Sequence, residues 1–82
     1  ERDRLAGLGD AAWNAKREQA ALSLMRRAHE HGLRLWGPWH PGTERTAERL
    51  AAMHQQRGEW LAEAGWQRFI VASRERVRGP SH

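Results

Sequence analysis

The scarcity of β-branched residues constrains the fold of this chain more than any other feature. Only five of the 82 residues are branched at Cβ: Thr43, Thr46, Ile70, Val71 and Val77. Because β-strands favour such residues, an all-β sandwich or barrel is excluded. Hydrophobic residues make up 39% of the chain, but 13 of them are alanine, so few large side chains remain to build a core. The sequence therefore predicts one small, mainly all-α domain.

The first predicted helix covers residues 10–31. Asp10 is a favoured N-cap, and no glycine or proline follows until Gly32, which is a good residue to end the helix. Ala20 and Ala28 lie on its apolar stripe with Ala21 beside it, and two small residues at the centre of this broad face let a partner helix approach closely. Residues 1–9 are predicted to be a lead-in or the end of a preceding helix.

A second helix is predicted over residues 43–64, after a stretch that stops regular structure. Residues 33–42 contain two prolines and two glycines, although residues 33–36 can also form a short extended piece. Thr43 is a good N-cap for the second helix, Gly58 interrupts its buried face, and Gly65 is predicted to end it.

The last segment, residues 66–78, fits two descriptions. Its apolar residues recur at helical spacing, but residues 69–71 are also the only β-rich run in the chain. We favour a helix, with a minor two-stranded β piece as the alternative. The predicted architecture is an antiparallel helical hairpin with a third short element packed across it, within a domain of residues 10–78 and a tail of 79–82. The predicted core consists of Trp13, Leu24, Met25, Leu50, Trp60, Leu61, Trp66, Phe69 and Ile70.

Arginine supplies most of the positive charge. The formal net charge is +4, from 14 basic and 10 acidic residues. The arginines of the last segment are Arg68, Arg74, Arg76 and Arg78. If that segment is extended, the last three point to one side and can follow a phosphate backbone, whereas in a helix they spread around the surface. Arg26 and Arg27 of the first helix are predicted to extend the same basic surface.

Two tryptophans lie in the loop that is rich in glycine and proline. Trp36 and Trp39 flank Gly37-Pro38, close to Arg34 and His40. Aromatic rings beside arginine can stack on bases or anchor a protein partner. The alternative interpretation is that both rings close the open end of the helical hairpin.

Several classes of function find no support in the residues. The chain contains no cysteine, and its five histidines are not spaced as metal ligands, so we expect neither a metal nor any other cofactor. No hydroxyl residue lies in the setting of a catalytic nucleophile, and no glycine-rich phosphate loop follows a strand, so we expect no enzyme and no small-molecule substrate. No apolar run approaches the length of a membrane span, and we expect a cytoplasmic location.

These features predict a nucleic-acid-binding accessory domain of a larger protein. Its arginine-rich C-terminal segment would contact phosphates, and its tryptophan loop would contact bases or a groove. The alternative is a protein interaction or oligomerisation domain that uses the tryptophan loop and the alanine-rich helix face. Salt distinguishes the two hypotheses, because binding to phosphates weakens steeply as salt rises and binding through tryptophan anchors does not.

Overall fold

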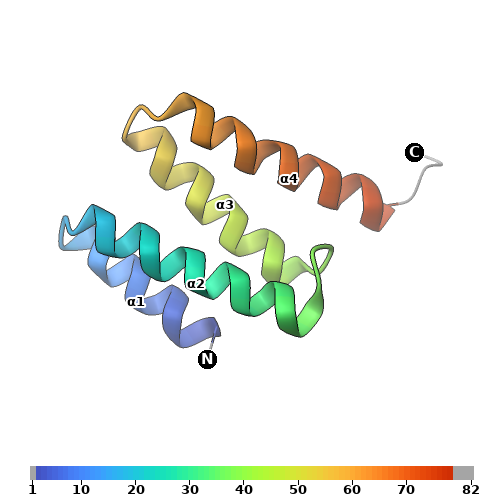
Figure 1. Ribbon diagram of the computed structural model, residues 1–82, viewed down its shortest axis with the longest axis horizontal. Helices are drawn as coiled ribbons and strands as arrows, with labels where there is room; N and C mark the ends of the chain where they lie inside the picture. Colours follow the sequence, from blue (N-terminus) through green and yellow to red (C-terminus); the bar gives the residue numbers. More distant parts are fainter. Residues whose placement is uncertain (1, 79–82) are drawn as a thin grey trace.

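Residues 2–78 form four helices. The computed structural model describes the backbone of residues 2–78 and the side chains of residues 4–76. The helices are α1 (Arg2–Asn14), α2 (Glu18–Trp36), α3 (Pro41–Gln56) and α4 (Trp60–Arg78) (Figure 1). The all-α prediction is confirmed, and so is the choice of a helix for the last segment. The alternative of a β piece is wrong, because residues 2–78 contain no strand. The predicted tail, residues 79–82, lies outside the described residues.

The predicted helix over residues 10–31 is interrupted by a turn after α1. The N–H of Arg17 donates to the carbonyl of Ala12 (2.8 Å) and that of Lys16 to Trp13 (2.9 Å), the bond pair of a Schellman cap. Lys16 adopts a φ of 64°, the left-handed conformation that glycine usually takes at this position. The turn was missed because no glycine marks it. Residues 2–9, predicted to be a lead-in, therefore belong to α1. Residues 10–14, predicted to begin the next helix, form the end of α1.

Replacing Lys16 by glycine is expected to raise the free energy of unfolding by about 0.5–1 kcal/mol. The substitution removes the left-handed penalty of about 1–2 kcal/mol, partly offset by the greater chain entropy of glycine in the unfolded state. Urea unfolding followed by circular dichroism measures the change.

Ala11→Gly, at an exposed position inside α1, is the matched control, and it is expected to lower the free energy of unfolding by about 1 kcal/mol. Equal losses in the two variants would show that Lys16 is not in a left-handed turn.

The second predicted helix, residues 43–64, is divided in the same way at Gly58. Gly58 has a φ of 73°, and the N–H of Glu59 donates to the carbonyl of His54 at 2.9 Å. The glycine that seemed to weaken one helix thus ends α3 and allows α4 to begin at Trp60. Gly65, predicted to end a helix, lies inside α4.

The loop between α2 and α3 is shorter than the composition of residues 33–42 suggested. Gly32 is buried inside α2, and the helix continues through residues 33–36 instead of becoming extended. Helix α3 begins two residues before the predicted N-cap, Thr43. His40 caps it, because its Nδ1 accepts a hydrogen bond from the N–H of Gly42 (2.9 Å). The Thr43 hydroxyl instead donates to the carbonyl of Gly37 (2.9 Å), which ties the two ends of the loop together.

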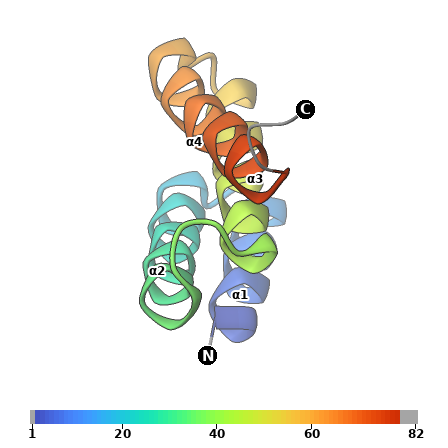
Figure 2. The same ribbon diagram turned by 90° about the vertical axis from the view of Figure 1, so that its right-hand side faces the viewer.

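Helices α1, α2 and α3 enclose the main core, and α4 lies along α3 as the second arm of a helical hairpin (Figures 1 and 2). Helices α1 and α2 approach closely where Gly9 faces Ala21 and Met25, as a Cβ added at Gly9 would lie 3.2 Å from the Met25 side chain. Of the small residues predicted to admit a close neighbour, Ala21 faces α1, whereas Ala20 is exposed. The main core consists of Leu5, Ala21, Leu22, Met25, Ala28, Leu50 and Met53.

The predicted core is only partly correct. Met25, Leu50 and Ile70 are buried, and Trp13, Leu24, Trp66 and Phe69 are half-buried. Trp60 and Leu61 are exposed, with 68% and 92% of their surface accessible. Their assignment to the core depended on a helix that ran unbroken past Gly58. The turn at Gly58 starts a new helix with a different rotation, which turns these two residues outward.

Candidate functional site

The outward face of α2 carries a row of exposed polar residues. Helical spacing places Gln19, Ser23, Arg26, Arg27, Glu30 and Arg34 on this face, and all six are exposed. The opposite face of α2 holds Ala21, Leu22, Met25, Ala28, His29 and Gly32, which are buried. Burial of the apolar stripe therefore fixes the rotation of the helix and directs the arginines to solvent. We call this row of six residues the basic face.

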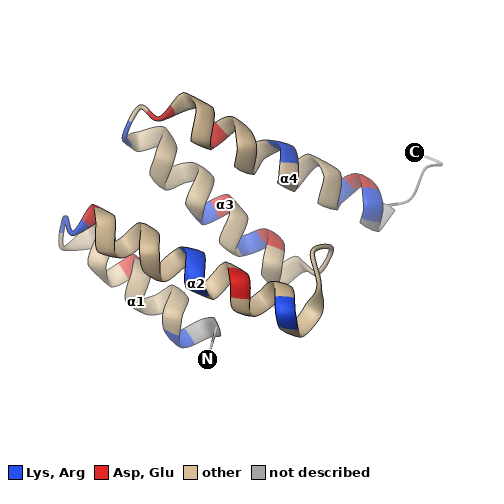
Figure 3. Ribbon diagram, viewed as in Figure 1, with Lys and Arg blue, Asp and Glu red and all other residues tan. Residues whose placement is uncertain are grey.

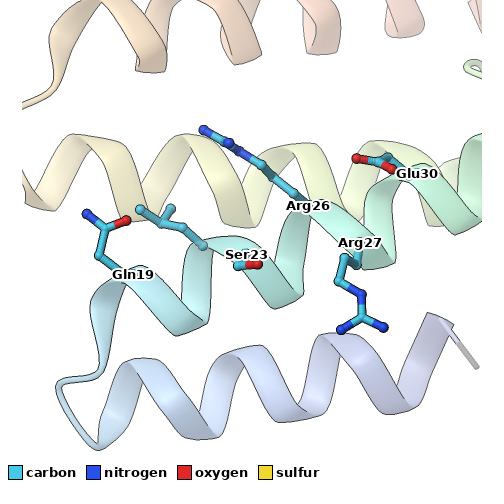
Figure 4. Close-up of a pocket in the computed structure, with 6 residues that line it drawn as sticks. Gln19, Ser23, Arg26, Arg27 and Glu30 are labelled. Atoms are coloured by element: carbon cyan, nitrogen blue, oxygen red, sulfur yellow. The ribbon is translucent and has the colours of Figure 1, made fainter.

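A shallow hollow of about 210 Å³ lies on the basic face. Its lining residues are Gln19, Leu22, Ser23, Arg26, Arg27 and Glu30. Arg26 and Arg27 extend to opposite sides of α2, and Ser23 and Gln19 lie on the preceding turns (Figure 4). Guanidinium, amide and hydroxyl groups are all donors to phosphate oxygens. The two guanidinium groups point away from each other, so each can donate to a separate anionic oxygen.

The charge on the basic face is not neutralised by ion pairs. Other arginines do bind carboxylates: Arg49 binds Asp10 (3.1 Å), Arg57 binds Glu18 (2.7 Å) and Glu59 (3.0 Å), and Arg74 binds Glu44 (3.3 Å) and Glu48 (3.0 Å). Within the described part of the chain, no ion pair involves Arg26, Arg27 or Arg34. Basic and acidic residues occur on both α2 and α3, and on α2 the arginines Arg26, Arg27 and Arg34 outnumber Glu18 and Glu30 (Figure 3). The positive charge of α2 remains available to a ligand.

The arginines of the last segment do not form one row. This segment is helical, so successive side chains diverge by about 100°, and the alignment that an extended chain would give is absent. Arg74 joins α4 to α3 through Glu44 and Glu48. The Arg76 guanidinium lies 6.0 Å from the centre of the Trp39 ring, in cation–π geometry. Arg68 is exposed on another side of α4, and the side chain of Arg78 lies outside the described residues.

The aromatic loop packs largely against the domain itself. Trp36 stacks on His40 with ring centres 4.3 Å apart, and Trp39 stacks on Phe69 of α4 at 6.1 Å. A Cβ at Gly42 would lie 2.5 Å from the Trp36 ring, so only glycine permits this stack. Trp36 and Trp39 keep 41% and 38% of their surface exposed. These contacts favour the interpretation that the rings close one end of the domain.

The structure regroups the predicted site residues. Arg34, predicted to act with the tryptophan loop, belongs to the last turn of α2 and shares the basic face with Arg26 and Arg27. Gln19 and Ser23 were not predicted to belong to a site. The spacing of Arg26, Arg27 and Arg34 carried the signal, since residues seven or eight apart share a helix face. The sequence analysis does not group these three arginines, because it predicts that the helix ends at Gly32.

The buried side chain of His29, on α2, contacts residues of both α3 and α4. The Thr46 hydroxyl donates to the carbonyl of Thr43 (2.8 Å), so its oxygen must accept from Nδ1–H of His29 (2.9 Å). The edges of Trp66 and Phe69 contact the His29 ring, at 4.9 and 5.1 Å between ring centres. Burial lowers the pKa of His29 below its ordinary value of 6.5, although a backbone hydrogen bond at Thr43 and the charge of Glu30 act in the opposite direction. His29 is therefore neutral in the folded domain near pH 7.

Acidification below about pH 6.5 is expected to lower the free energy of unfolding. The unfolded chain binds a proton on His29 near pH 6.5, whereas the folded chain binds it only at lower pH, so the unfolded state is favoured progressively as pH falls. Urea unfolding between about pH 7.5 and 5.5, above the range in which carboxylates titrate, measures the slope.

The His29→Gln variant keeps a donor but does not titrate, so it is expected to show a smaller pH dependence than the unchanged chain. His31→Gln is the matched control on the same helix and should keep the full dependence. An unchanged slope in His29→Gln would contradict the assignment.

A second buried histidine stabilises the turn between α3 and α4. His54 and Glu59 are joined at 2.8 Å between Nδ1 and Oε1, and Nε of Arg57 donates to the same oxygen at 3.0 Å. The hydrogen bonds from Arg57 and His54 lower the pKa of Glu59, and the Glu59 and Glu18 carboxylates raise that of Arg57. These bonds occupy the C-terminal end of α3, so we assign the cluster a structural role.

Neither ligand clusters nor relatives identify a function for this domain. Among the described residues, no three His, Asp or Glu side chains are grouped as they would be around a metal ion. None of the four described helices combines the length and the apolar character needed to span a membrane. Comparison with protein-family models, curated proteins and solved structures found no match to this chain.

Proposed function

We propose that this chain is a nucleic-acid-binding accessory domain of a larger protein, and that the basic face of α2 is its main contact surface. The observation that carries the proposal is the set of Arg26, Arg27 and Arg34, which are exposed on one helix face and free of ion pairs within the described residues. Arginine forks bind phosphate oxygens in bidentate geometry, and Gln19 and Ser23 add neutral donors beside them.

The dimensions of the face suit a nucleic-acid backbone. From Gln19 to Arg34 the helix rises by about 22 Å, at 1.5 Å per residue, which spans several successive phosphates. Glu30 is the only acidic residue of the basic face. The proposal is of a binding domain without catalytic activity, and it includes a cytoplasmic location, where DNA or RNA is accessible.

The two surfaces of the alternative hypothesis are less suited to a partner. Ala21 and Ala28 of the alanine-rich helix face are completely buried in the domain's own core. Trp36 and Trp39 are stacked on His40 and Phe69, which leaves less than half of each side chain accessible. A role in protein association therefore needs a different surface.

Salt-dependent binding tests the proposal on the unchanged 82-residue chain. Labelled duplex DNA, single-stranded DNA and RNA are titrated, and binding is followed by fluorescence anisotropy at about 50 and 200 mM salt. If three phosphates are contacted, the affinity is expected to fall about 40-fold over this range. An acidic polypeptide is the control for unspecific attraction. Absence of saturable binding to all three nucleic acids at the lower salt would exclude the proposed function.

A further inference from the structure

The side of α4 that faces away from α3 is unusually apolar for a solvent-exposed surface. Trp60, Leu61 and Val71 are 68%, 92% and 52% exposed. Helical spacing places Ala64 and Ala72 on the same side, while Trp66, Phe69 and Ile70 face the domain. Exposed tryptophan beside exposed leucine is typical of an interface anchor. We call Trp60, Leu61, Ala64, Arg68, Val71, Ala72 and Glu75 the outer face of α4.

The outer face has a protruding end and a hollow end. Trp60 and Leu61 project at the start of the helix. A shallow hollow of about 330 Å³ lies further along it and is lined by Gln67, Arg68, Val71, Ala72 and Glu75. The residues Leu61 and Val71 are separated by about 15 Å along the helix axis, at 1.5 Å per residue. The two ends are therefore complementary in shape but too far apart to meet within one molecule.

We propose that a second copy of this chain covers the outer face, with its α4 antiparallel to the first. A two-fold axis near the level of Trp66 would place Trp60 of each copy beside Val71 of the other, and Leu61 beside Ala72. Each protruding end then fills the hollow of the other copy, as a self-complementary two-fold interface requires. A parallel pairing would set the two protruding ends against each other and leave both hollows empty.

The residues near the proposed axis allow the helices to approach. Ala64 and Gly65 are small, and a Cβ added at Gly65 would meet nothing within 4 Å, so this part of the surface is open. The aliphatic part of Arg68 can lie over Ala64 of the other copy while its charge stays in water.

Charge complementarity supports the same antiparallel order. Glu75, exposed near the C-terminal end of α4, would lie near the N-terminal end of the other α4. A carboxylate is favoured beside a helix N-terminus. The opposite order would place Glu75 near the C-terminal end of the neighbouring helix, next to the other Glu75.

Sedimentation velocity over a concentration series of the 82-residue chain tests this pairing. The chain is expected to change from monomer to dimer with a dissociation constant in the micromolar range of small, transient interfaces. Leu61→Glu is expected to weaken the dimer at least tenfold, since it places a charge in the hollow of the other copy. Leu35→Glu, at a leucine of α2 that is 58% exposed, is the matched control and should leave the dissociation constant unchanged.

A mixing experiment identifies the register. Ala72→Lys is also expected to weaken self-association at least tenfold, because Ala72 faces Leu61 of the other copy. An equimolar mixture of the Leu61→Glu and Ala72→Lys variants should regain dimers, as one new Glu–Lys pair forms and one Leu–Ala contact is kept. A monomer at every concentration, equal effects of Leu61→Glu and Leu35→Glu, or no recovery on mixing would overturn the proposal.

Discussion

Replacement of Leu50 by alanine is expected to lower the free energy of unfolding by about 2–5 kcal/mol. Leu50 belongs to α3 and is completely buried in the core that also contains Leu5 of α1 and Met25 of α2. Truncation removes buried methyl groups and leaves a cavity, because the surrounding helices relax only partly. A domain of this size has a total stability of roughly 4–12 kcal/mol, so this single cavity removes a large share of it.

Urea unfolding followed by tryptophan fluorescence and circular dichroism measures the loss. Leu35→Ala is the matched control, and it is expected to change the stability by less than about 0.5 kcal/mol because Leu35 is mostly exposed. A loss below about 1 kcal/mol for Leu50→Ala would show that Leu50 of α3 is not packed in the core that α3 shares with α1 and α2.

Simultaneous replacement of Arg26, Arg27 and Arg34 by alanine is expected to lower the affinity for nucleic acid by about 1,000-fold or more at low salt. Each lost charge-assisted hydrogen bond contributes at least about 1.5 kcal/mol, which is roughly tenfold in affinity. The dependence of log affinity on log salt should become shallower by about 2.7, since three fewer counterions are displaced. Fluorescence anisotropy at several salt concentrations measures both changes.

Two control variants distinguish the effect of the basic face on affinity from the effect of total charge. Arg74→Gln removes one positive charge that already binds Glu44 and Glu48, so it should change affinity much less than any single replacement on α2. Arg68→Ala combined with Arg76→Ala tests the arginines of the last segment. If this double variant loses more affinity than the α2 variant, the contact surface lies on α4 and the assignment to α2 is wrong.

The turns show how local signals succeed and fail. Gly58 was visible as a defect in an amphipathic pattern, but only the structure shows it as a helix end. The turn at Lys16 had no signal at all, because a lysine takes the left-handed position that glycine normally marks. The packing of α1 on α2 through Gly9 and Ala21 maintains this turn despite its local cost. The backbone strain lies at Lys16 itself, whereas the contacts that offset it are made between α1 and α2.

The candidate site also could be predicted only in part from the sequence. The arginines were recognisable from their number, but their grouping depended on where each helix begins and ends. Arg34 joined Arg26 and Arg27 once α2 was seen to continue past the buried Gly32. Arg74 was removed from the site by Glu44 and Glu48 of α3, residues that lie 30 and 26 positions away in sequence. Ion pairs over such separations leave no local pattern.

The sequence by itself determined the helical class, the positive charge and the presence of apolar stripes, because these follow from composition and from short-range spacing. The tertiary structure decided the two Schellman turns, the burial of Ala21 and Ala28, and the exposure of Trp60 and Leu61. The rotation of each helix about its axis depends on which neighbour covers its apolar stripe. That rotation decides which arginines and which tryptophans face the solvent, and it is a property of packing between segments distant in the chain.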